Sequence, residues 1–129
     1  MIIDSSALVA MMLSEPESQR IKRAIGHASC RVAAPTYLES SMILISRVGI
    51  EAARDLDMVI MQLDVEVVPF TRIQASIARD AFHRYGKGRH PAGLNFGDCM
   101  AYAAAKELGE ELLFKGTDFF QTDIAVAAY

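Results

Sequence analysis

Short, almost wholly apolar runs recur along the chain. Each predicts a buried strand, because a run without a polar face suits a strand covered on both sides. The four runs are Met1 to Ile3, CRVAA at 30–34, VEVVPF at 65–70 and ELLFKG at 111–116. The tail TDIAVAAY, residues 122–129, is a candidate for a further strand.

The stretches between these runs carry apolar residues at helical spacing. Pro16 suits the first turn of one helix, Pro35 opens another that Gly49 can end, and Gly109 can end the last. The predicted helices are Ser5 to Leu13, Pro16 to Ile25, 36–48, Glu51 to Leu63, Arg72 to Tyr85 and 96–108. The segment GKGRHPAG, residues 86–93, is predicted to be an irregular loop.

This alternation predicts an α/β fold whose largely parallel sheet is covered by helices on both faces. With 129 residues, we expect a single domain over 1–129. The composition, 52% hydrophobic and 22% charged, excludes a disordered chain. The longest apolar runs are about half the length that crosses a bilayer, and Met1 leads straight into a strand. We therefore expect a cytoplasmic protein with no membrane association.

The remaining composition excludes other classes of site. Cys30 and Cys99 form no CxxC pair, so they indicate buried thiols and neither a disulfide framework nor a zinc site. The net charge of -3 argues against a protein that coats nucleic acid non-specifically. It leaves room for a local basic surface beside an acidic site.

Four acids fall where ligand sites of open α/β sheets lie, beyond the carboxyl ends of the strands. Asp4 directly follows the first strand, and Glu39 lies one turn into the helix after CRVAA. Asp98 lies in the first turn of the alanine-rich helix, and Asp118 follows the ELLF strand. If the strands are parallel, these four carboxylates converge at one edge.

Helix capping is the competing explanation, and for any single aspartate it is the stronger one. Glu39 fits it poorly, because it lies beyond the cap position and its neighbours at i+3 and i+4 are Met42 and Ile43. Convergent carboxylates repel each other unless a cation neutralises them. Oxygen ligands without clustered cysteine or histidine favour Mg²⁺ or Mn²⁺, which can support hydrolysis of a phosphodiester by metal-activated water.

Four segments carry a family resemblance from end to end of the chain. They are MIIDSSALVA, PTYLESSMIL, LNFGDCMAYAAAK and LLFKGTDFFQTDI, in order and at similar spacing. They resemble the PIN-domain ribonucleases, specifically the VapC-like toxins of toxin–antitoxin pairs. The resemblance implies a three-layer α/β/α sandwich, an Mg²⁺- or Mn²⁺-dependent RNA endonuclease, a homodimer and an antitoxin protein that blocks the site.

The same resemblance assigns the site residues. Asp4, Glu39 and Asp98 match the first three acids of the family, and Asp118 matches the acid of its GxDF segment. Ser6 and Thr117 occupy hydroxyl positions that help to orient water or phosphate. Asp123 belongs to the resembling segment too, so both Asp118 and Asp123 are candidate metal ligands, and the sequence leaves open which of them approaches the metal more closely.

Two basic features are candidates for contacts with RNA phosphates. Residues 79–90 form the most basic stretch of the chain, although a solvated helix end and loop explains it equally well. Lys115 lies beside the proposed site.

Two other classes of function compete with a nuclease. One is a non-catalytic binding module on the same scaffold. The other is a phosphoryl-accepting receiver-like domain, but Ser5 and Ser6 stand where a receiver or a DxD phosphatase needs a second acid.

Overall fold

The computed structural model describes residues 1–129 and has a four-stranded parallel sheet at its centre, in the order β3-β2-β1-β4. The strands are β1 (Ile2–Ile3), β2 (Arg31–Ala33), β3 (Glu66–Val68) and β4 (Leu112–Leu113). Ile2 pairs with Arg31 on one side and with Leu112 on the other, so β1 is central. The predicted parallel α/β sheet is confirmed, and all four strands end at the same edge.

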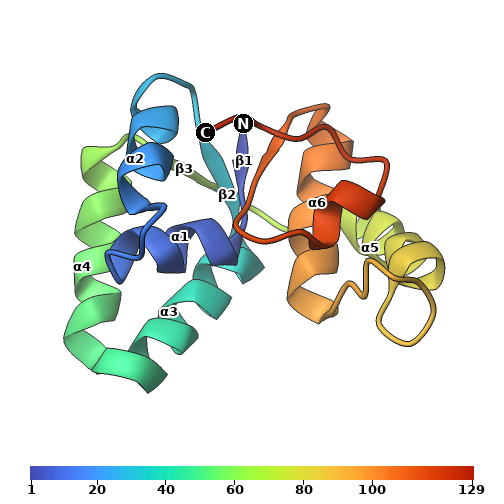
Figure 1. Ribbon diagram of the computed structural model, residues 1–129, viewed down its shortest axis with the longest axis horizontal. Coiled ribbons are helices and arrows are strands. Elements are labelled where there is room, and N and C mark those ends of the chain that lie inside the picture. The colour runs from blue at the N-terminus through green and yellow to red at the C-terminus, as the bar shows by residue number, and fades with distance from the viewer.

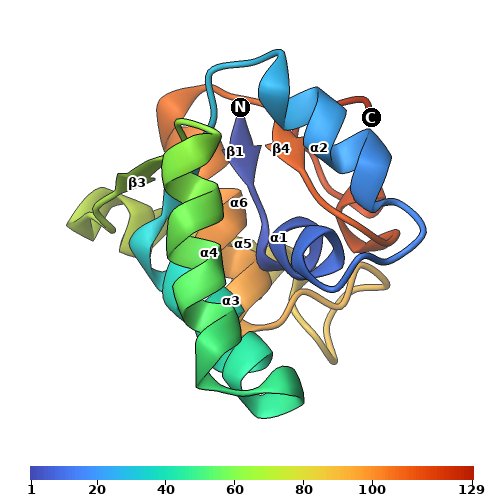
Figure 2. The ribbon, with the colours of Figure 1, turned by 90° about the vertical axis from the view of Figure 1, so that its left-hand side faces the viewer.

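Six α-helices and one 3-10 helix surround the sheet, with the predicted loop at 86–93 before α6. Figure 1 shows α1 to α4 on one side of the strands and α5, α6 and η1 on the other, which is the predicted three-layer arrangement, while the last residues return towards α2. Figure 2 looks onto the α4 side, with β1 and β4 behind the helices. The helices are α1 (Ser5–Met12), α2 (Ser18–Gly26), α3 (Ala34–Val48), α4 (Ile50–Gln62), α5 (Arg72–Tyr85), α6 (Phe96–Leu108) and η1 (Asp118–Gln121).

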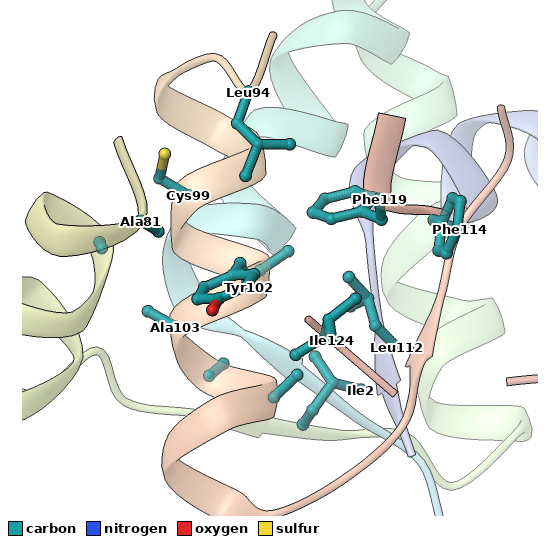
Figure 3. Packing of buried hydrophobic residues seen from close by; sticks show 14 of the residues in the cluster. Ile2, Ala81, Leu94, Cys99, Tyr102, Ala103, Leu112, Phe114, Phe119 and Ile124 are labelled. Atoms are coloured by element: carbon teal, nitrogen blue, oxygen red, sulfur yellow. The ribbon is translucent and has the colours of Figure 1, made fainter. Parts of the chain in front are cut away.

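Successive strand residues point to opposite faces, and this alternation builds two separate cores. Ile2 and Leu112 pack with α5, α6 and the segment around Phe119, as Figure 3 shows. Ile3 and Leu113, one residue further along the same strands, pack with α1 to α4. Both cores are apolar, which explains why β1 and β4 lack a polar face. Cys99 and Cys30 are buried free thiols, one in each core, as predicted.

The second helix begins later than predicted. Ser14 has a positive φ of 54°, and the N–H of Glu15 donates to the carbonyl oxygen of Ala10, so the chain turns sharply after α1. Pro16 belongs to this turn, and α2 starts at Ser18. The prediction that Pro16 lies inside the helix is therefore wrong by two residues.

The tail forms less sheet than the sequence suggested. Residues Asp118–Gln121 form the short helix η1, and beyond it only Val126 bridges to Leu112. The backbone N–H of Leu112 donates to the carbonyl oxygen of Ala125, and the carbonyl oxygen of Leu112 accepts from the N–H of Ala127. These are the only two backbone groups of Leu112, and β4 is too short to extend the ladder. No helix of the protein has the length and apolar character needed to cross a membrane.

Candidate active site

A cavity of about 350 Å³ lies beyond the carboxyl ends of the central strands. Three of the four predicted acids, Asp4, Glu39 and Asp98, line it together although they come from three distant parts of the chain. The other polar side chains that line it belong to Ser5, Ser6, Asn95, Glu15, Arg47 and Lys115. The cavity therefore joins the end of β1, α3, the start of α6 and the end of β4.

Asp4 is the N-cap of α1 and is almost completely buried. Its Oδ2 accepts from the backbone N–H of Ser6 at 2.9 Å and from the Ser6 hydroxyl at 2.5 Å. Its Oδ1 is buried without any hydrogen-bond donor. Burial raises the pKa of Asp4, the bonds from Ser6 oppose this, and the negative charge of Glu39 adds to the rise. Capping explains one oxygen of Asp4 and leaves the other free.

Glu39 lies on α3 against the first turn of α6. Its Oε2 is also buried without a donor. A Cβ atom on Gly97 would come within 2.2 Å of Glu39 Oε1 and 2.5 Å of Oε2, so the carboxylate rests against bare backbone at this position. Burial raises the pKa of Glu39, and the charge of Asp98 raises it further. A glycine at 97 is thus required for the approach of Glu39.

Asp98 is the third residue of α6 and completes a capping box with Asn95. The Asn95 side chain accepts from the Asp98 N–H at 2.9 Å, and Asp98 Oδ2 accepts from the Asn95 N–H at 2.8 Å. Burial, followed by the charges of Asp4 and Asp118, raises the pKa of Asp98 to about 6. As in Asp4, one carboxylate oxygen is held by the backbone.

The four acids influence one another electrostatically. The charge of Glu39 raises the pKa of Asp4, and the charge of Asp98 raises the pKa of Glu39. The charges of Asp4 and Asp118 both raise the pKa of Asp98. Asp118 is exposed at the start of η1 and faces this group from the β4 side without lining the cavity itself. No group of three or more acidic, histidine or cysteine side chains is already drawn together as a finished coordination shell.

Asp123 has other partners. Its Oδ1 accepts from the Tyr102 hydroxyl at 2.5 Å, and its Oδ2 accepts from Lys106 Nζ at 3.0 Å. These partners, the Tyr102 bond foremost, lower the pKa of Asp123 to about 2. The structure thus engages Asp123 in a bridge between the tail and α6, whereas the charge of Asp118 contributes to the raised pKa of Asp98. Which of the two acids binds a metal stays a prediction.

The two predicted hydroxyl residues differ in placement. Ser6 lines the cavity, donates to Asp4 and accepts from the Lys115 backbone N–H at 2.9 Å, so it ties the end of β1 to the end of β4. Thr117 is exposed just before η1, and its side chain makes no capping bond there. Ser6 therefore orients an acid, while Thr117 remains a prediction.

Three arginines of the basic stretch at 79–90 contact other residues of the same stretch. Arg84 lies over the ring of Tyr85 and Arg89 over the ring of Phe82, while Arg79 lies 3.6 Å from Asp80. Lys115, in contrast, lines the acidic cavity.

Sequence reasoning missed Asn95, Glu15 and Arg47. An asparagine three residues before an aspartate at a helix start is a capping signal, and it identifies Asn95. Glu15 and Arg47 carry no such local signal, because their place at the cavity depends on how α1 packs on α3.

The donor set fits a hard divalent cation. Two carboxylate oxygens, Asp4 Oδ1 and Glu39 Oε2, are buried without a partner, and buried polar atoms without partners are rare in native proteins. The pKa values of Asp4, Glu39 and Asp98 are all raised, by burial first and then by neighbouring negative charges. A cation bound among the three would stabilise their ionised forms and offset both effects. Carboxylate oxygens without cysteine or histidine match Mg²⁺ or Mn²⁺.

Comparison with known proteins places the chain among proteins of similar length. Residues 1–125 match the PIN domain family. The chain is 45% identical to VapC ribonuclease Mb0640 of Mycobacterium bovis, over 99% of this chain and 98% of that one. It is 44% identical to Ribonuclease VapC of Mycolicibacterium smegmatis, over 97% of this chain and 98% of that one.

Solved structures share the fold at low sequence identity. VapC20 of Mycobacterium tuberculosis, described as a sarcin–ricin loop cleaving toxin, aligns with a TM-score of 0.79 at 16% identity, over 96% of this chain and 95% of that one. The toxin–antitoxin complex from Klebsiella pneumoniae gives a TM-score of 0.70 at 17% identity, over 99% and 97%. Together with the family match and the relatives at 44–45% identity, these findings show that the chain belongs to the PIN-domain family and, within it, to the VapC ribonucleases.

Proposed function

We propose that this protein is a divalent-metal-dependent RNA endonuclease and the toxin of a toxin–antitoxin pair. The observation that carries the proposal is the pair of buried, donor-free oxygens, Asp4 Oδ1 and Glu39 Oε2, in a cavity shared with Asp98. The relatives named as VapC ribonucleases give the reaction class. Membership of the PIN family sets aside the receiver-like alternative.

Asp4, Glu39 and Asp98 would hold the cation, with Asp118 contributing charge from the β4 side. Because no finished coordination shell exists, small side-chain shifts would close these ligands around the ion. The ion would supply a water molecule of lowered pKa and would stabilise the charge that develops at the phosphoryl group.

The chain's own residues prepare this site. Two hydrogen bonds from Ser6 hold Asp4 Oδ2 in place, so that Oδ1 is the oxygen left free to bind a metal ion. The backbone N–H of Asn95 fixes Asp98 Oδ2 in the same way. Since one oxygen of each aspartate is already held by the protein, little conformational freedom is lost when the other binds.

Cleavage of RNA by the purified, antitoxin-free protein tests the proposal. Wild type should cut with Mg²⁺ or Mn²⁺ and stop with EDTA, and Asp4→Asn and Asp98→Asn should each lose at least about a hundredfold in rate, because each removes charge from the ligand set. Asp55→Asn, at an exposed aspartate of α4, is the matched control and should cut like wild type. Equal cutting by all four proteins would indicate a contaminating nuclease, and no cutting would favour a binding module.

The antitoxin is proposed to cover the face next to the acidic cavity. A second cavity of about 610 Å³ lies between α3 and the start of α6, and Glu39 and Arg47 line both cavities. Leu38, Met42 and Phe96 line it and are each more than half exposed, so apolar side chains gather beside the acidic cavity. Structural neighbours that are toxin–antitoxin complexes support a protein partner here. A homodimer stays a prediction that sedimentation can test.

A further inference from the structure

The acidic cavity has a basic rim that the metal site does not use. Arg47 of α3 and Lys115, just after β4, both line it, and between them lies Glu15. Glu15 Oε2 pairs with Lys115 Nζ, and Oε1 lies 3.8 Å from Arg47 Nη1. A second acid, Glu17, lies 3.4 Å from Lys115 Nζ. One carboxylate thus spans two cations, with one oxygen towards each.

Both cations are tied to residues of the proposed metal site. Glu39, Ile43 and Arg47 follow one another at four-residue spacing on α3, so they share a face, and all three line the cavity. The Lys115 backbone N–H donates to Ser6 Oγ, and the same hydroxyl donates to Asp4. The cations therefore have fixed positions relative to the acids.

A phosphodiester needs such cations at this place. Counting Glu15, four carboxylates line the cavity against only Arg47 and Lys115, so an RNA backbone approaches a site of excess negative charge. A phosphodiester carries two non-bridging oxygens, like the two oxygens of a carboxylate, and can accept from two cations in the same bridging manner.

We infer that Arg47 and Lys115 form the phosphate-binding site for the RNA backbone, and that Glu15 occupies it as an internal stand-in until RNA displaces it. The inference rests on the proposed function and adds the residues that bind substrate. Arg47 is 58% exposed and Lys115 35%, so the phosphate can reach both without rearrangement of the fold.

The test measures RNA binding separately from cleavage. The background is Asp98→Asn with Mg²⁺, so that RNA binds without being cut. The affinity for a single-stranded oligoribonucleotide is measured by fluorescence anisotropy between about 50 and 200 mM salt. Each phosphate contact to a single strand contributes about 0.7 to the slope of log K against log salt. Arg47→Gln with Lys115→Gln should lower the slope by about 0.7, because both cations contact one phosphate, and should weaken binding at least tenfold, with single variants in between.

Glu15→Gln should act in the opposite direction. It keeps the size of the side chain but removes the charge that competes with phosphate, so binding should tighten about threefold or more. The same change made in the Arg47→Gln, Lys115→Gln background should have a smaller effect, because the two cations for which Glu15 competes are gone. Arg54→Gln is the matched control, since Arg54 is an exposed arginine of α4 that pairs with Glu51.

The outcomes separate this inference from the proposed function. If wild type cuts RNA but the double variant binds with the parent slope and affinity, the phosphate site is wrong and the nuclease proposal stands. If Glu15→Gln weakens binding, Glu15 supports the cations and does not compete for them, which also contradicts the inference. Thermal melting of each variant verifies that it is folded.

Discussion

Asp98→Asn should stabilise the metal-free protein at neutral pH, although it damages the proposed site. Burial and the charges of Asp4 and Asp118 raise the pKa of Asp98 from 3.8 to about 6. A folded-state pKa above the unfolded one means that the native protein binds more protons in this window. The free energy of unfolding therefore falls as pH rises from about 4 to about 6, and the penalty is complete above that range.

The size of the effect follows from the shift. About two pKa units at 1.36 kcal/mol each give a ceiling of about 3 kcal/mol. Asp98 is partly exposed, and solvent screening reduces the expected gain to about 1–2 kcal/mol. Asparagine keeps an oxygen that can accept from the Asn95 N–H, so the capping box is retained in its neutral form.

Urea unfolding in EDTA measures the difference directly. Asp98→Asn should exceed wild type by about 1–2 kcal/mol at pH 7.5 and match it at about pH 3, below the pKa of 3.8 of the unfolded carboxyl group. Added Mg²⁺ should stabilise wild type more than the variant, because only wild type retains the full ligand set. Asp55→Asn controls for loss of a surface charge. A variant less stable than wild type at pH 7.5 in EDTA would refute the idea that Asp98 is held among repelling carboxylates.

Four further substitutions test the arrangement of the site. Gly97→Ala should impair cleavage about tenfold or more, because the new methyl group displaces the Glu39 carboxylate from its place against α6. The free energy of unfolding in urea should change by less than about 1 kcal/mol, since the displaced atoms are the flexible end of a side chain and a helix favours alanine over glycine. Normal activity would contradict the close approach. Asn95→Ala should cost about 1 kcal/mol of stability through the lost N-cap, and an unchanged unfolding midpoint would show that the cap contributes nothing. Asp123→Asn should leave Mn²⁺ affinity unchanged by calorimetry while Asp118→Asn weakens it, and the reverse order would make Asp123 the ligand.

Much of the architecture could be predicted from sequence because the short strands are mostly apolar, and β1 and β4 are buried on both faces. In β4, Leu112 enters one core and Leu113 the other, so no polar residue alternates with the apolar ones. Such a run is easily distinguished from the amphipathic helices. The rule that ligand sites lie beyond the strand ends predicted that Asp4, Glu39, Asp98 and Asp118 converge. The first three line one cavity, and Asp118 does not line it. Their role as metal ligands stays a prediction.

The details that sequence could not supply depend on tertiary packing. Asp118 and Asp123 are only five residues apart, and no local signal shows that Asp123 pairs with Lys106 while Asp118 lies exposed at the start of η1. The link between Glu15, Arg47 and Lys115 joins three separate segments, and no local spacing marks it.

The central claim is that carboxylates from distant parts of the chain are gathered around one divalent cation. Anomalous scattering from a crystal of the antitoxin-free protein soaked in Mn²⁺ tests it most directly. The account predicts a manganese peak bound by Asp4, Glu39 and Asp98, with Asp4 Oδ1 and Glu39 Oε2 among its ligands. A soaked crystal without manganese in this cavity, from protein that still cleaves RNA in a Mn²⁺-dependent manner, would contradict it.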